Sequence, residues 1–424
     1  FAHDEQSFGE NENASVIKCG SYTGNGQANK AGPFINLGWE PQFLLIKNTS
    51  DSASWAMFDT MRGIRTGGKT QTLSADLTNA EGDYTNFATV TATGFHAGYN
   101  DNYTNSSGDT YIYLAIRRPD SYVGKPAEAG TDVFAMDTGS GSSGIPTFDS
   151  GFPVDFAFER TYASSQSWYT GARLIDSQYL TINSTAAAAA ASNHEFDSNT
   201  GWESSSADNT HQSWMWKRHA GFDVVTYNGT GANRTQAHGL GRVPEMIVVK
   251  KRNSTQNWYT YHKGLNGGTN PELKTVMWNS DSGEDNGGSF TFNDTAPTST
   301  VFSLASSHAT NGSGDTYIAM LFASVDGICK VGYYSGSSSS QTITTGFQPR
   351  FVIIKSTSSS RNWCVFDTTR GWGSGNDQEL NFNKNDAQGG NNDFGAPTST
   401  GFTLETGHND TNSSGKDYIY YAHA

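Results

Sequence analysis

The chain has 424 residues, which is too long for one ordinary hydrophobic core and favours two to four domains at roughly 100–200 residues each. Its 47 glycines, 12% aromatic residues and only 16% charged residues are typical of short strands joined by many turns, so we expect a mostly β protein. The net charge of −14 argues against nucleic acid and anionic membrane surfaces as partners.

The first residues match an internal junction of the same chain. The stretch 1–24, FAHDEQSFGENENASVIKCGSYTG, is similar to 322–336, FASVDGICKVGYYSG, where one predicted unit ends and the next begins. This similarity predicts that 1–14 is the end of a preceding repeat or a linker. We therefore expect the chain to be a segment of a longer repeat polypeptide.

Four tandem repeats organise the rest of the chain. In each repeat an apolar residue at a predicted strand start is followed twelve positions later by a tryptophan: Phe43 and Trp55, Phe156 and Trp168, Met246 and Trp258, Phe351 and Trp363. A Gly/Pro element precedes each of these strands, as expected where a proline fixes the backbone before a strand. The predicted domains are 15–120, a divergent 121–220, 221–328 and 329–424.

Each repeat contains about seven strand candidates, shown by the last one: KVGYYSG, QTITTG, RFVIIKS, NWCVFDT, QELNFNK, GFTLETG and DYIYYA. Seven short strands with regular turn signals predict an antiparallel β-sandwich of jelly-roll or immunoglobulin-like type. FVIIK is continuously apolar, as expected for a strand covered on both faces. Because the junctions between repeats are short, we expect the four sandwiches to stack as a rod.

A recurring W-x-x-F-D-x-x-R-G element could be interpreted as catalytic, with Asp59 and Asp367 each three residues before an arginine. The third repeat, however, has His262 at this position, an exchange that chemistry would not tolerate and a structural anchor would. We therefore expect the two aspartates to pin loops at strand ends. The regular spacing of Trp55, Trp168, Trp258 and Trp363 assigns these tryptophans to the domain cores.

Loops rich in Asn, Asp, Ser and Gly precede the last strand of three repeats and contain Asp109, Asp315 and Asp417. Such oxygen-bearing side chains suit Ca²⁺, although the same residue types are ordinary turn formers. Calcium is therefore a possible ligand, and no other cofactor is expected. Three cysteines without CxxC spacing do not predict a zinc knuckle, and no P-loop, nucleophile elbow or dinucleotide fingerprint points to an enzyme.

Aromatic residues in loop-like surroundings are the remaining candidates for ligand contacts. Sugar rings stack on Trp and Tyr faces and hydrogen-bond to nearby polar side chains. The residues that we predict to contact a glycan are Trp39, Tyr84, Tyr99, Tyr103 and Trp372.

The paired elements HGLGRVPEMIVVKKRNSTQNWYTYHKGL and GFQPRFVIIKSTSSSRNWCVFDTTRG, followed by NGSGDTYIAMLFA and SSGKDYIYYAHA, resemble repeats of tail-fibre and tail-associated proteins of marine tailed bacteriophages. The resemblance implies a non-enzymatic, structural and adhesive protein on the surface of the virion, with other virion proteins, further copies of itself and a host-surface glycan as partners. A capsid decoration or head fibre, and a glycan-degrading tailspike, are the alternatives. No heptad stalk specifies an oligomeric state.

Overall fold

A computed structural model describes most of the chain, and it is built almost entirely of antiparallel strands, which confirms the all-β prediction. No helix among the described residues is long and apolar enough to cross a membrane. The described residues are 8, 14–27, 31–64, 69–85, 87–99, 101–119, 123, 126–141, 145–175, 177–191, 193–204 and 208–424.

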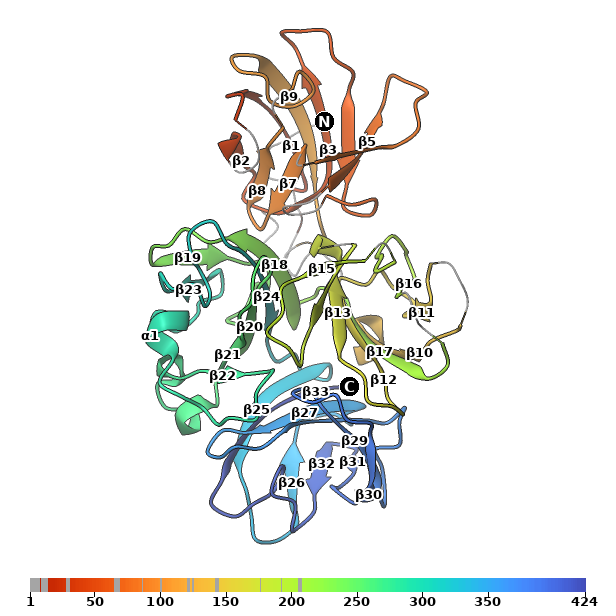
Figure 1. The fold of residues 1–424 in the computed structure, drawn as a ribbon, viewed down its shortest axis with the longest axis vertical. Helices are drawn as coiled ribbons and strands as arrows, with labels where there is room; N and C mark the ends of the chain where they lie inside the picture. Colours follow the sequence, from red (N-terminus) through yellow and green to blue (C-terminus); the bar gives the residue numbers. More distant parts are fainter. Residues whose placement is uncertain are drawn as a thin grey trace.

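The first group of strands, which we call unit 1, lies at the top of Figure 1. Its large sheet has the order β1-β9-β3-β4-β5-β6 and its small sheet the order β2-β8-β7. The strands are β1 (Ile17–Thr23), β2 (Phe34–Asn36), β3 (Pro41–Asn48), β4 (Ala56–Asp59), β5 (Lys69–Ser74), β6 (Gly82–Thr85), β7 (Ala88–Thr91), β8 (Gly94–Ala97) and β9 (Thr110–Arg117).

Unit 2 has the large sheet β10-β17-β12-β13-β14-β15 and the small sheet β11-β16. Its elements are η2 (Gly130–Asp132), β10 (Phe134–Thr138), β11 (Phe148–Asp149), β12 (Phe156–Thr161), β13 (Tyr169–Ala172), η3 (Arg173–Ile175), β14 (Gln178–Thr181), β15 (Ala189–Ala190), β16 (Gly201–Trp202) and β17 (His211–Trp216).

Unit 3 has the large sheet β18-β24-β20-β21-β22 and the small sheet β19-β23. Its elements are β18 (Phe222–Asn228), β19 (Arg234–Ala237), β20 (Met246–Lys251), β21 (Trp258–His262), η4 (Leu265–Gly268), η5 (Pro271–Leu273), β22 (Val276–Met277), α1 (Gly288–Thr291), β23 (Val301–Leu304) and β24 (Thr316–Phe322).

Unit 4 has the large sheet β25-β33-β27-β28-β29-β30 and the small sheet β26-β32-β31. Its strands are β25 (Cys329–Ser335), β26 (Gln341–Thr344), β27 (Phe351–Ser356), β28 (Trp363–Asp367), β29 (Asp377–Asn381), β30 (Gly389–Asn392), β31 (Pro397–Thr398), β32 (Gly401–Leu404) and β33 (Asp417–His423). In all four units the first strand pairs with the last, and the last pairs with the strand that precedes the tryptophan strand.

Each large sheet has two faces because side chains alternate along a strand. One face packs on the small sheet of its own unit; in unit 4 this core contains Val352, Ile354 and Phe402. In units 2, 3 and 4 the opposite faces meet in one common core, which includes Phe158, Val248 and Ile353. The strands β20 and β27 are buried along their whole length, which confirms that a continuously apolar strand is covered on both sides.

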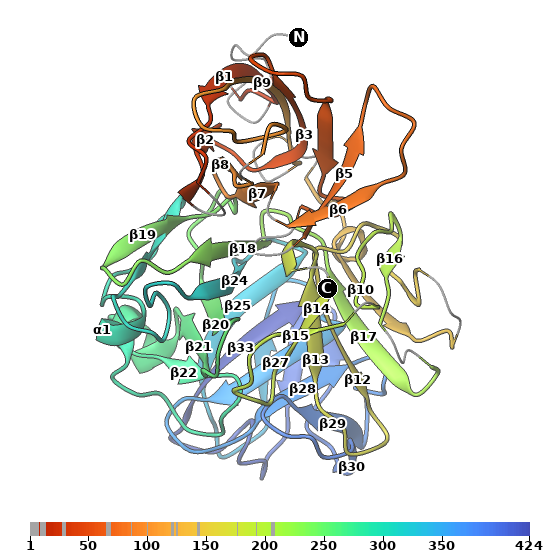
Figure 2. The same ribbon diagram turned by 45° about the horizontal axis from the view of Figure 1, so that its top comes forward.

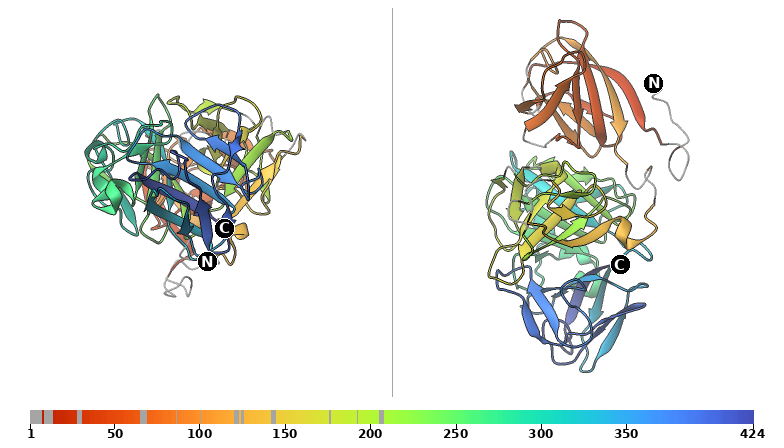
Figure 3. Two further views of the ribbon diagram at one scale, coloured as in Figure 1. Left: turned by 90° about the horizontal axis from the view of Figure 1, so that it is seen from below. Right: turned by 90° about the vertical axis from the view of Figure 1, so that its right-hand side faces the viewer.

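Units 2, 3 and 4 surround this common core as a three-unit body (Figures 1 and 2), and three lobes are visible from below in Figure 3. The tryptophans Trp168, Trp258 and Trp363 lie in the core and are 0–2% exposed. The prediction of a rod is therefore wrong for these units. Short junctions keep consecutive units next to each other, but they do not determine how the units are oriented. The second apolar face of each large sheet is buried because the three sheets turn these faces toward one another.

Unit 1 has a core of its own, formed between its two sheets and joined by Leu174 of unit 2. Trp55 does not belong to this core and is only half-buried, so its assignment to a domain core is wrong. Trp55 occupies the place in the repeat that Trp168, Trp258 and Trp363 occupy in the other units, where the tryptophan belongs to the common core. Trp168, Trp258 and Trp363 are confirmed as core residues.

Candidate functional site

Two of the five aromatic residues predicted to contact a glycan are buried, and the prediction is wrong for them. Trp39 is 5% exposed in the core of unit 1, where its Nε1 donates to Ser15 Oγ at 3.2 Å. Trp372 is 4% exposed in unit 4 and donates from Nε1 to the carbonyl oxygen of Gly395 at 2.8 Å. In both cases a loop folds back over the sandwich, so that the indole fills the core and its N–H keeps an acceptor.

The other three aromatic residues come together in unit 1. Tyr84 of β6 stacks on Phe87 with ring centroids 4.5 Å apart and planes 3° apart, and Tyr99 lies 4.7 Å from the same ring. Tyr103 completes the group at 6.0 Å. Phe87 is 1% exposed, whereas Tyr84 and Tyr99 are 45% and 39% exposed. We call this group, Tyr84, Tyr99 and Tyr103 around Phe87, the tyrosine platform.

The loop that carries Tyr99 and Tyr103 is held by hydrogen bonds within itself. Asp101 Oδ1 accepts from the backbone N–H of Tyr103 at 2.9 Å, and the N–H of Asn105 donates to the carbonyl oxygen of Asp101 at 3.0 Å. Burial raises the pKa of Asp101, although the two backbone N–H groups of Tyr103 and Thr104 lower it. Asp101 therefore holds residues 101–105, which include Tyr103 of the platform, through hydrogen bonds within this segment.

The Asp-Arg elements form loop anchors, as predicted. In unit 1 Arg62 Nε lies 2.6 Å from Asp59 Oδ2, and in unit 4 Arg370 Nε lies 2.7 Å from Asp367 Oδ2. The backbone N–H of each arginine also donates to the other carboxylate oxygen. Asp367 additionally accepts from Trp214 Nε1 of unit 2 at 3.1 Å, so this anchor also joins two units.

The three aspartates predicted as calcium ligands hold their loops to the neighbouring strand. Asp315 forms an ion pair with Lys251 Nζ at 2.8 Å and accepts from His308 Nδ1 at 2.8 Å. Asp109 accepts from Asn48 Nδ2 at 2.9 Å, and Asp417 accepts from Ser335 Oγ at 2.8 Å. A lysine ammonium occupies the place that a cation would take at Asp315, so the geometry opposes the calcium interpretation there. For Asp109 and Asp417 it stays a prediction.

One group of metal-ligand residue types lies where units 2 and 4 meet. His219, Cys329 and His423 bring their ligand atoms within 4.8 Å of one another. Nδ1 of His219 accepts from the N–H of Gly221 at 3.1 Å, so the proton of the neutral ring is on Nε2. That nitrogen is therefore a donor rather than a zinc ligand. Burial, together with the positive charges of Arg242 and Lys217, lowers the pKa of His219 to about 3, so the surroundings also disfavour a cation.

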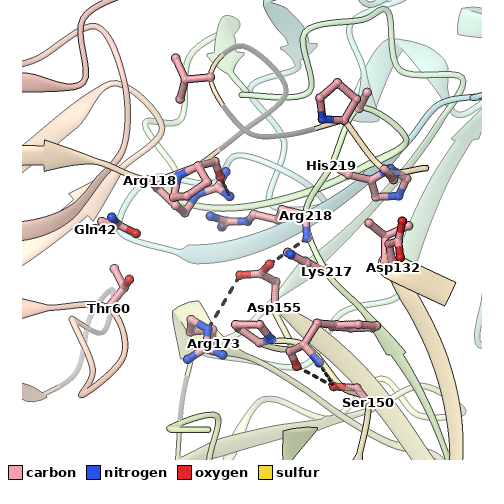
Figure 4. A pocket seen from close by; sticks show the side chains of 18 of the residues that line it. Gln42, Thr60, Arg118, Asp132, Ser150, Asp155, Arg173, Lys217, Arg218 and His219 are labelled. Carbon is pink, nitrogen blue, oxygen red and sulfur yellow. Dashed lines mark hydrogen bonds and ion pairs between the residues drawn. The ribbon is translucent and has the colours of Figure 1, made fainter. Parts of the chain in front are cut away.

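A cavity of about 1180 Å³ lies between unit 1 and the three-unit body (Figure 4). Its lining combines apolar residues with a group of charged side chains: Glu40, Arg118, Glu128, Asp132, Asp155, Arg173, Lys217, Arg218 and Arg242. Arg218 NH1 lies 2.7 Å from Glu40 Oε1 of unit 1, and its Nε lies 3.3 Å from Asp223 Oδ1 of unit 3. Arg218, which follows β17 of unit 2, thus connects three units.

The charges of this junction neutralise one another. Arg118 lies 3.4 Å from Glu40 and 3.6 Å from Asp223, and Arg173 lies 3.8 Å from Asp155. Burial works against the charge of Arg218, but Glu40, Asp223 and Asp155 outweigh it and raise the pKa of the guanidinium. Because Arg118, Arg173 and Arg218 pair with the carboxylates Glu40, Asp155 and Asp223, the junction is suited to holding units together rather than to acid–base catalysis.

Sequence reasoning missed Glu159, which lies inside the sandwich of unit 2. The residue is 2% exposed on β12, at the position that Ile46, Val249 and Ile354 occupy in the other units. Its Oε1 accepts from Ser204 Oγ at 3.2 Å, whereas Oε2 has no hydrogen-bond partner among the described residues. Burial raises the pKa of Glu159 to about 8, so the carboxyl group is protonated at neutral pH.

We expect the variant Glu159→Gln to be more stable than the wild type at pH 8, by roughly 2–4 kcal/mol. The unfolded carboxyl group loses its proton near pH 4.5 and the folded one near pH 8, so wild-type stability falls as pH rises through this window. Urea unfolding at pH 5, 6.5 and 8 measures the difference, which should shrink toward pH 5. The exposed Glu81→Gln is the control, and an equal pH dependence of both variants would contradict the assignment.

A family model described as a domain of unknown function (DUF7483) matches residues 8–118 and 138–424. A search of curated proteins found no match. The unmatched stretch 119–137 includes η2 and most of β10 of unit 2. Since the model covers nearly all of the sequence, including all four units, the chain belongs to the DUF7483 family.

Proposed function

We propose that this chain is a non-enzymatic structural and adhesive protein that contacts a glycan through the tyrosine platform of unit 1. The observation that carries the proposal is the convergence of Tyr84, Tyr99 and Tyr103 on the buried ring of Phe87. Rigid tyrosine faces supply contact area at a low cost in conformational entropy. The resemblance of the repeats to phage tail proteins supports a setting on the virion surface, facing the host.

The double variant Tyr84→Ala/Tyr99→Ala tests this proposal. Because an aromatic contact contributes about 1 kcal/mol, we expect the loss of two to weaken glycan binding by at least about tenfold. Binding is measured on a glycan array and by adsorption to bacterial cells. Tyr333→Ala is the matched control, because Tyr333 is 49% exposed in unit 4, away from the platform, and its removal should leave binding unchanged.

Equal binding by the double variant and the wild type would contradict the role of the platform. The non-enzymatic part of the proposal has a separate test. Incubation of the chain with host capsule or lipopolysaccharide, followed by sizing of the products, should release no oligosaccharide. Released oligosaccharides would instead identify a glycan-degrading protein.

A further inference from the structure

One face of unit 1 is apolar and uncovered by any described part of the chain. We define the outer face of unit 1 as the apolar side chains on the side of its large sheet that is turned away from its small sheet, together with Trp55, which directly precedes β4. None of them belongs to the core of unit 1; Ile112 is 41% exposed and the others are half-buried. The outer face consists of Ile17, Cys19, Phe43, Leu45, Trp55, Met57, Leu73, Ile112, Leu114 and Ile116.

The corresponding positions of the other three units form the common core. The strand pairing gives the correspondence, because β3 and β9 of unit 1 pair in the same way as β12 and β17, β20 and β24, or β27 and β33. The central pair of the outer face is Leu45 with Leu114; its counterparts are Phe158 with Trp214, Val248 with Met320, and Ile353 with Tyr421. All six counterparts lie in the common core. Within this chain, a face of this kind is therefore covered by the equivalent faces of two other units.

A ring of three hydrogen bonds joins the units around the common core. Trp168 Nε1 of unit 2 donates to the carbonyl oxygen of Asn381 in unit 4 at 2.8 Å. Trp363 Nε1 of unit 4 donates to Met277 of unit 3 at 2.8 Å. Trp258 Nε1 of unit 3 donates to Thr181 of unit 2 at 3.1 Å, which closes the ring.

The three acceptors occupy one position of the repeat. Each acceptor lies on the next strand of the large sheet and pairs with the residue that directly follows the tryptophan. The pairs are Asn381 with Cys364, Met277 with Tyr259, and Thr181 with Tyr169. In unit 1 the same position is Ser74, which pairs with Ala56. Trp55 Nε1 has no acceptor within the described part of the chain. With Trp55 as donor and the carbonyl group of Ser74 as acceptor, unit 1 has both positions that such a ring needs.

We propose that the outer face of unit 1 is the interface of a homotrimer. Three copies of the chain bring their unit 1 sheets together as units 2, 3 and 4 do within one chain, and Trp55 Nε1 of each copy donates to the carbonyl oxygen of Ser74 in the next. One chain contributes one such sheet, so three chains complete the ring, and a closed threefold ring leaves no apolar face open. The proposal is independent of glycan binding.

The mass of the full chain in solution tests the proposal. Light scattering coupled to size exclusion should give three times the chain mass of 45.7 kDa at micromolar concentration. Leu45→Glu and Ile112→Lys each place a charge on the outer face and should give the mass of one chain. Val243→Glu is the control, because Val243 is 50% exposed in unit 3 and lies outside the face; this variant should remain a trimer.

Alkylation of cysteine provides a second readout on folded protein. Cys19 lies half-buried on the outer face, whereas Cys329 and Cys364 are buried. Iodoacetamide should therefore modify Cys19 at least tenfold more slowly in the trimer than in Ile112→Lys, whose circular dichroism should match the wild type. A wild-type mass of one or two chains at every concentration, a trimeric Ile112→Lys, or equal alkylation rates would each overturn the proposal.

Discussion

Replacement of Trp363 by alanine is expected to lower the free energy of unfolding of the three-unit body by about 3–5 kcal/mol. Trp363 is 2% exposed in the common core, where it packs against Trp278 with ring centroids 6.4 Å apart. The substitution leaves a cavity between units 3 and 4 and removes the hydrogen bond to the carbonyl oxygen of Met277. Urea denaturation followed by far-UV circular dichroism measures the loss.

Two further variants separate the causes. Trp363→Phe keeps most of the ring volume and should cost only about 1 kcal/mol for the lost hydrogen bond. Trp55→Ala, measured in the Leu45→Glu background, removes the equivalent but half-buried tryptophan of unit 1 and should cost less than about 1 kcal/mol. If Trp363→Ala cost no more than Trp55→Ala, the common core would not be the main source of stability in the body.

The strands themselves were predictable because they follow a local pattern. Gly/Pro punctuation, a run of apolar residues and a tryptophan twelve positions on mark the same hairpin in each unit, which the structure shows as β3–β4, β12–β13, β20–β21 and β27–β28. The Asp-Arg anchors were predictable for the same reason, since residues three apart at a strand end contact each other without any tertiary information.

The arrangement of the units was not predictable, because it depends on which surfaces meet. FLLIK in unit 1 and FVIIK in unit 4 have the same apolar pattern, yet the first strand is covered on one face and the second on both. Trp55 and Trp363 likewise occupy identical places in the repeat. Their different burial follows from neighbours in other units, such as Met277, which is 86 residues from Trp363, or, in our proposal, from neighbours on another chain.

The candidate site was predictable only in part. Tyr84 and Tyr99 were identified by their loop-like surroundings, but the same criterion selected Trp39 and Trp372, whose loops fold back into the sandwich. Glu159 was missed because a glutamate on a strand normally faces solvent, and nothing in the sequence shows that its side of the sheet is closed.

Replacement of Arg218 by methionine is expected to cost about 3–5 kcal/mol in the free energy of unfolding. The side chain of Arg218 is 2% exposed and lies between Glu40 at 2.7 Å and Asp223 at 3.3 Å. Methionine has a similar shape but no charge, so two buried carboxylates lose a cationic partner. Because Glu40 belongs to unit 1, we also expect unit 1 to separate from the three-unit body, which would increase the radius of gyration in small-angle X-ray scattering.

The control for Arg218 is Arg62, which pairs with Asp59 and Glu81 within unit 1 at side-chain exposures of 23–37%. Arg62→Met should cost less than about 1 kcal/mol, because solvent screens such pairs. The double variant Arg218→Met/Glu40→Gln should recover part of the lost stability, since it removes one of the two carboxylates that lose Arg218 and keep only Arg118 as a cationic partner. If the two arginine variants cost the same, or if the double variant recovered nothing, the junction would be held by packing rather than by its buried charges.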